Sequence, residues 1–133
     1  MQVDVIFCDQ VRIENNGKHM LVGVYPHDVM TVTQVPGAIL VSAWIKVQDL
    51  PMGDYDFEMT FLSPQVPLSP PPYFGRVHVS NPSAATIMFS GPANIPLSEE
   101  GVVSVLLKMT GAANEIVVDQ VAGRLSVIKI SNR

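Results

Sequence analysis

The chain has few of the features that mark exported proteins. It contains a single cysteine, Cys8, so no disulfide can form within it, which indicates a reducing compartment. Its Asn81-Pro82-Ser83 triplet has proline in the position that prevents N-glycosylation. The first residues lack the basic and apolar regions of a signal peptide. Together these features predict a cytoplasmic protein.

Charge is scarce as well. Asp, Glu, Lys and Arg make up 15% of the 133 residues, and the net charge is −4. The basic residues are scattered and form no stripe, so neither nucleic acid nor an anionic membrane is an expected partner. No apolar run is long enough to span a membrane, and a hydrophobic content of 47% is too high for disorder. The length predicts one domain over residues 1–133.

A helical period is missing from the sequence, and a period of two takes its place. Tyr55, Phe57, Met59 and Phe61 alternate with polar residues, and one parity of 39–47 is apolar throughout. Such alternation predicts strands with one buried face. Repeated along the chain, it predicts an all-β domain. Eight or nine short strands joined by turns favour an antiparallel β-sandwich of the immunoglobulin-like or Greek-key type, with a small barrel as the alternative.

The N-terminal hairpin is the best-defined unit in the sequence. One apolar parity runs from Val3 to Ile13, and a second apolar run covers 20–25. The turn between them contains Gly17, which can adopt the positive φ that a tight hairpin requires. Asp9 interrupts the apolar parity, which predicts a β-bulge or a break in this strand.

Further strands follow from the same alternation and from the positions of glycine and proline. Residues 64–72 hold five prolines and cannot form a central strand. A bend is expected at Gly123, and one helical turn at most around residues 97–100. The expected strands cover 39–47, 55–62, 75–80, 86–90, 102–109, 116–118 and 124–130. Residues 26–37 are expected to be irregular, with a short edge segment at 30–33.

Three aromatic residues are candidates for binding. Trp44 lies on the parity opposite the apolar residues of its strand, where it could stack on a ligand or cover a half-buried sheet face. Tyr73 and Phe74 end the proline-rich segment and would be its anchors if the segment binds a partner. The alternative for this segment is a stiff connection between two sheets.

Metal-binding patterns are weak. His27 and Asp28 are adjacent, and His78 could join them only through the fold. Asp49, Asp54 and Asp56 lie near one turn, but calcium needs six or more oxygen ligands. The sequence therefore predicts neither a metal nor another cofactor.

Catalytic motifs are missing too. The sequence has no Gly-x-Ser-x-Gly elbow and no glycine-rich phosphate loop, and Cys8 lies in an apolar strand where it is expected to be inert. We expect no catalytic residue and a non-enzymatic interaction module that binds a protein. The alternatives are a carbohydrate-binding β-sandwich that uses Trp44 and Tyr73, and then a metal-dependent hydrolase. Because strand 102–109 carries only Lys108 as a charge, a homo-oligomer or a tight complex with another protein is expected.

The opening hairpin also carries a resemblance to a known family. The stretch Cys8-Asp9-Gln10-Val11-Arg12-Ile13-Glu14 leads to Asn16-Gly17-Lys18-His19-Met20-Leu21-Val22-Gly23-Val24-Tyr25, and 96–101 reads Pro-Leu-Ser-Glu-Glu-Gly. Over nearly its whole length the chain resembles a family of small bacterial and phage-associated proteins of unknown function. The resemblance implies a stand-alone β-sandwich domain and brings no activity or catalytic residue.

Overall fold

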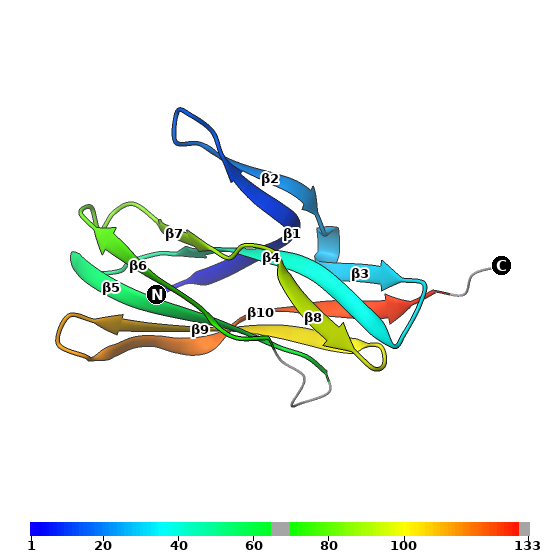
Figure 1. The fold of residues 1–133 in the computed structure, drawn as a ribbon. Helices are drawn as coiled ribbons and strands as arrows, with labels where there is room; N and C mark the ends of the chain where they lie inside the picture. Colours follow the sequence, from blue (N-terminus) through cyan, green and yellow to red (C-terminus); the bar gives the residue numbers. More distant parts are fainter. Residues whose placement is uncertain (65–69, 131–133) are drawn as a thin grey trace.

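The computed structural model describes residues 1–64 and 70–130, and this part of the chain is almost entirely β (Figure 1). A short 3-10 turn, η1 (Pro26–Asp28), is its one helical segment, and no helix in the described ranges is long and apolar enough to cross a membrane. The described strands are β1 (Val3–Ile13), β2 (His19–Val24), β3 (Val29–Val32), β4 (Gly37–Val47), β5 (Gly53–Leu62), β6 (Tyr73–Val79), β7 (Thr86–Phe89), β8 (Ala93–Leu97), β9 (Gly101–Gly111) and β10 (Ile116–Lys129).

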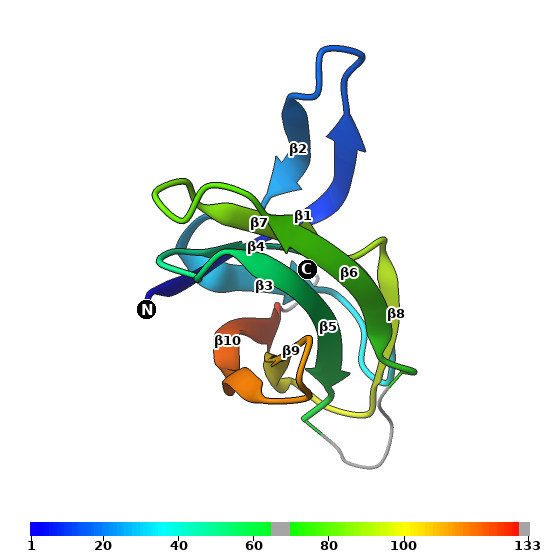
Figure 2. The same ribbon diagram turned by 90° about the vertical axis from the view of Figure 1, so that its left-hand side faces the viewer.

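The strands form two sheets. Sheet A has the order β2-β1-β4-β7, and β8 continues the β7 side of β4. Sheet B has the order β3-β10-β9-β5-β6 and curls around the molecule, as Figure 2 shows. Within the described ranges every strand pair is antiparallel except β3 with β10, which is parallel. The expectation of a wholly antiparallel arrangement is therefore wrong at this edge of sheet B.

The all-β prediction is confirmed, but the described chain has ten strands rather than eight or nine. No strand was expected at 93–97, where the structure has β8. It contains Pro96, which an edge strand tolerates, and in the described ranges β8 pairs only with β4. The two C-terminal strands that the sequence predicted, 116–118 and 124–130, form one continuous strand, β10. Its register shifts between Val121 and Gly123, where the expected bend lies. Residues 65–69 of the proline-rich segment lie outside the described residues.

The core lies between the two sheets. Ile39, Val41, Ala43, Ile45 and Val47 of β4 are buried, as their shared parity predicted. Strands β5 and β9 contribute from sheet B, with Met59, Phe61, Val103, Val105, Leu107 and Met109 fully buried.

Strand β1 takes part in two different pairings. Residues 3–8 pair with β4, whereas residues 8–13 pair with β2. Cys8 is the point of change, opposite both Ser42 and Val24. The register is the same on both sides of Asp9, so no β-bulge inserts a residue there. Asp9 and Gly23 are nevertheless not a ladder pair, so the β1–β2 ladder is interrupted at Asp9, where a break was expected. Beyond this point the β1–β2 hairpin stands out from the body in both views (Figures 1 and 2), and we call residues 9–24 the arm.

Candidate functional site

The base of the arm is held by contacts between residues far apart in the sequence. The Tyr25 hydroxyl donates a hydrogen bond of 2.6 Å to Asp9 Oδ1, and Ser42 Oγ donates one of 3.2 Å to the Asp9 carbonyl. Gly23 lies opposite Asp9 with a φ of +70°, and a Cβ at this glycine would lie 2.7 Å from Asp9 Cγ. The carboxylate therefore occupies the space that any side chain at position 23 would need. These contacts fix the direction in which the arm leaves sheet A.

Two groups at this base have raised pKa values. Burial, the hydrogen bond to Asp9 and the negative charge of Asp9 raise the pKa of Tyr25 to about 12. Burial also raises the pKa of the Cys8 thiol, with a smaller contribution from Asp9, and the Gln10 backbone opposes the shift. Both groups are therefore kept in their neutral forms. A raised pKa and full burial make Cys8 a poor nucleophile, as the sequence predicted.

An aromatic cluster fills the angle between the arm and sheet A. Trp44 is opposite Ile6 of β1 and Phe89 of β7. Its indole Nε1 donates a hydrogen bond of 3.0 Å to Nδ1 of His19, the first residue of β2. The His19 ring also packs edge-on against Phe89, with 5.3 Å between ring centroids. Because indole is only a donor, this His19 nitrogen is unprotonated in the contact.

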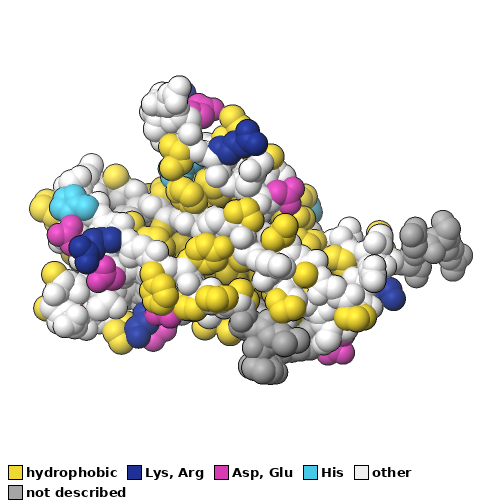
Figure 3. Space-filling view, viewed as in Figure 1, with side chains coloured by type: hydrophobic (Ala, Val, Ile, Leu, Met, Phe, Trp, Pro, Cys, Tyr) yellow, Lys and Arg dark blue, Asp and Glu magenta, His cyan; other side chains and the backbone are white. Residues whose placement is uncertain are grey.

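The arm itself exposes large apolar side chains. Ile13 is 59% exposed, Met20 44% and Val24 47%. Arg12, Glu14 and Lys18 are exposed near the tip. Ile13 is opposite His19 and Met20 is opposite Arg12, so Ile13 and Met20 point to opposite faces of the arm. Figure 3 shows hydrophobic side chains both on the arm and across the body below it. Both faces of the arm therefore expose apolar side chains that a protein partner could cover.

The three aromatic residues that the sequence suggested for binding do not form one site. Trp44 belongs to sheet A and is half-buried under His19. Tyr73 of sheet B donates a hydrogen bond of 3.1 Å to the Pro92 carbonyl and packs edge-on against Phe61. Phe74 follows on the outer face of β6, where it is 73% exposed. Of the three, Phe74 is the one whose ring is open to solvent.

The histidine and carboxylate candidates for metal binding are separated or paired with other groups. His27 and Asp28 lie in η1, while His78 lies on β6 with Nδ1 2.6 Å from Asp54 Oδ1. Asp56 forms an ion pair of 3.0 Å with Arg76. The described residues contain no group of three or more His, Cys, Asp or Glu side chains placed to hold a metal. His27, Asp28 and His78 therefore do not converge on one another.

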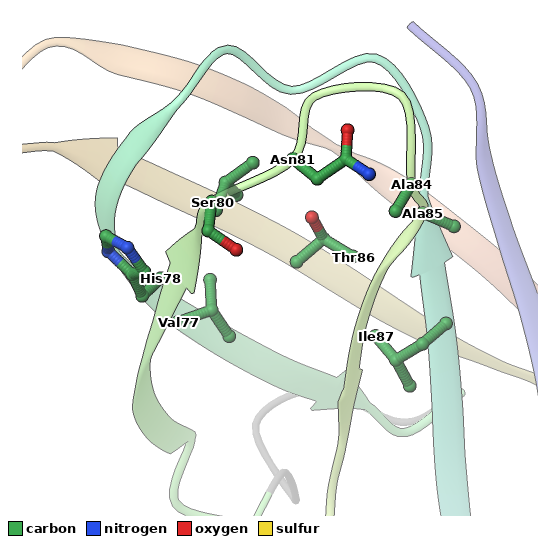
Figure 4. A pocket seen from close by; sticks show the side chains of 9 residues that line it. Val77, His78, Ser80, Asn81, Ala84, Ala85, Thr86 and Ile87 are labelled. Carbon is green, nitrogen blue, oxygen red and sulfur yellow. The ribbon is translucent and has the colours of Figure 1, made fainter.

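A pocket of about 300 Å³ lies between β6 and β7 at the loop that joins them (Figure 4). Ser80, Asn81 and Thr86 contribute its polar groups, and Val77 and Ile87 contribute apolar walls. His78, the titratable residue of the lining, is turned to Asp54 on the neighbouring strand. The lining thus brings together no nucleophile and base, and we assign it no chemistry.

The sequence reasoning did not find the arm or the contact of His19 with Trp44. One pattern did point to the base of the arm, because Asp9 interrupts an apolar parity and Gly23 follows in the paired strand. In the structure the Asp9 carboxylate lies over Gly23 of the paired strand. Neither a scan against protein-family models nor a search of curated proteins finds a match to this chain. The resemblance carried by the hairpin therefore stays a prediction.

Proposed function

We propose that this protein is a non-enzymatic interaction module that binds another protein through its arm. The observation that carries the proposal is the exposure of Ile13, Met20 and Val24 on a hairpin that stands away from the body. Burial of such side chains supplies most of the free energy of protein association. Phe74, on the outer face of β6, is proposed as a further contact residue.

We also propose that the domain is a β-sandwich with immunoglobulin-like topology. The order β1-β4-β7 in one sheet corresponds to strands A, B and E of that fold. The order β10-β9-β5-β6 in the other corresponds to strands G, F, C and C′. This topology commonly serves recognition by surfaces at sheet edges and loops, which is consistent with a binding role.

The protein-binding proposal is preferred to carbohydrate binding because of where the aromatic rings lie. Stacking on a sugar needs an open ring face, whereas Trp44 is engaged by His19 and Tyr73 by Phe61. A metal-dependent hydrolase would need ligands that converge, and His78 is instead paired with Asp54.

Site-specific photo-crosslinking in the cells from which the gene derives tests the proposal. A photoreactive phenylalanine analogue replaces Ile13 on the arm, and the matched control replaces Ile116, which is 57% exposed on β10. We expect a discrete crosslinked protein from position 13 and not from position 116. Equal crosslinking at the two positions, or none at position 13, would overturn the assignment of the arm as the binding surface.

A further inference from the structure

The outer strand of the arm, β2, is an edge strand without the usual protection. Its sequence, His-Met-Leu-Val-Gly-Val, contains neither proline nor Asp, Glu, Lys or Arg, and it pairs on one side only, with β1. Edge strands of soluble proteins usually carry charge or proline, which prevents pairing with other chains. The longer edge strand β6 carries Arg76 and His78, and β8 carries Pro96. Among the edge strands of the described ranges, β2 is the longest that has no such protection.

The hydrogen-bond pattern of the hairpin shows which backbone groups of β2 point outward. The Glu14 amide donates to the Lys18 carbonyl at 2.8 Å, which closes the hairpin beside its turn. Hydrogen-bonded and non-bonded pairs alternate along an antiparallel ladder. Met20, opposite Arg12, therefore faces β1 with its N–H and C=O. The N–H and C=O groups of His19 and Leu21 point away from β1, in the direction from which another strand would approach.

We propose that β2 pairs with β2 of a second copy of this chain, antiparallel and about a two-fold axis at Leu21. The inference rests on the proposed function, since it takes the arm as the binding surface, and it adds the identity of the partner. In this register Leu21 lies opposite Leu21 of the second copy, and Met20 lies opposite Val22. The outward backbone groups of the two Leu21 residues then bond to each other. Two arms together form a four-stranded sheet.

The charges at the two ends of the strand favour a second copy in this orientation. Lys18 directly precedes β2, and the Asp9 carboxylate lies over Gly23 near its other end. Antiparallel pairing brings Lys18 of each copy toward Asp9 of the other, whereas parallel pairing brings like charges together. In this register His19 of the second copy lies opposite Gly23. The edge is thus complementary to itself in both apolar contacts and charge.

The arrangement is also sterically open. The arm projects from the body in two perpendicular views, so its outer strand can be approached without the two bodies meeting first (Figures 1 and 2). Pairing covers Met20 and Val24, which the single chain leaves exposed. The contact is isologous and closes at two copies, so it produces a dimer and not a fibre.

Light scattering of the purified full chain at about 100 μM tests the inference, since a dissociation constant in the micromolar range gives mostly dimer there. The expected mass is twice the 14.5 kDa of the chain. Met20→Lys places a charge within the apolar pairing and is expected to give the monomer mass. The control Leu40→Lys, at a 59% exposed site on β4, is expected to keep the dimer. A monomeric wild type, or a dimer that Met20→Lys leaves intact, would overturn the inference.

Disulfide trapping gives the register independently. Residues directly opposite in a hydrogen-bonded pair have Cα atoms about 5.5 Å apart, which suits a disulfide. Leu21→Cys is therefore expected to form a covalent dimer under mild oxidation, and Ile116→Cys is not. Equal trapping at both positions would contradict the register. A monomeric wild type whose position 13 crosslinks to a different protein would refute the second copy as partner while leaving the proposed function in place.

Discussion

The two glycines of the hairpin that have positive φ offer a matched test of how the arm is held. Gly17 has a φ of +83° and no heavy atom within 4 Å of the position its Cβ would take. Gly23 has a φ of +70°, and its Cβ would meet the Asp9 carboxylate. Alanine at either position meets similar backbone strain. Only alanine at position 23 also displaces Asp9.

The magnitudes follow from these differences. A left-handed conformation costs a non-glycine residue about 1–2 kcal/mol. Loss of the freedom that glycine has in the unfolded chain offsets this by about 0.4–1 kcal/mol. We therefore expect Gly17→Ala to lower the free energy of unfolding by about 1 kcal/mol. Gly23→Ala moves Asp9 away from the Tyr25 hydroxyl as well, and a net hydrogen bond contributes about 1 kcal/mol, for a total of about 2 kcal/mol.

Urea unfolding followed by far-ultraviolet circular dichroism measures both costs. The strand that carries Asp9 continues into sheet A, so loss at the base of the arm is expected to affect the unfolding of the whole domain. In a Tyr25→Phe background, the excess cost of Gly23→Ala over Gly17→Ala should disappear, since the hydrogen bond is already absent. Costs for Gly17→Ala and Gly23→Ala that agree within about 0.5 kcal/mol would refute the role given to Asp9.

Three further predictions concern groups at the arm. The Tyr25 pKa of about 12 lies above its unfolded value of about 10, so the stability it contributes is fully present below pH 10 and is lost as the pH rises through 12. Ultraviolet absorbance can be followed against pH for the wild type and for Tyr25→Phe, and the difference between the two curves reports the ionisation of Tyr25. We expect its step near pH 12. A step near pH 10 would contradict the contact with Asp9. Cys8 should react slowly with a thiol reagent in the native protein and rapidly in urea, because it is fully buried; prompt native labelling would argue against that burial. His19→Ala should shift the emission of Trp44 to longer wavelength and increase its quenching by acrylamide, and an unchanged spectrum would exclude His19 as the cover of the indole.

Local patterns in the sequence predicted most of the strands because alternation and turn chemistry act over a few residues. Gly17 adopts the positive φ that the hairpin turn requires, as expected. Strand β5 covers the residues whose alternation was clearest. Strand β8, which contains Pro96, was not predicted. Whether a strand tolerates proline depends on whether it is central or at an edge. That distinction is set by the neighbouring strands and not by the segment itself.

The candidate site was less predictable because long-range contacts make it. The bond from Ser42 to Asp9 joins residues 33 apart in sequence, and the bond from Trp44 to His19 joins residues 25 apart. Phe74 is exposed to solvent, as a binding anchor would be. Its neighbour Tyr73 instead donates a hydrogen bond to the Pro92 carbonyl and packs edge-on against Phe61. Alternation assigns both residues to a strand, but it does not say which sheet face another element covers.

The few charged residues of this chain are distributed so that β2, the outer strand of the arm, contains no Asp, Glu, Lys or Arg. On the outer face of β5 and β6, Asp54 faces His78 and Asp56 faces Arg76 across the two strands. The edge of sheet B at β6 thus carries charge, and the edge of sheet A at β8 carries Pro96. With few charges available, protection of these edges leaves β2 as an uncharged edge on a projecting hairpin. The edge strands β3 and β7 also lack charge and proline, but each has only four residues, so β2 is the longest unprotected edge in the described part of the chain. Placing a lysine on β2 should therefore remove association without affecting the fold, which separates this account from one based on general surface hydrophobicity.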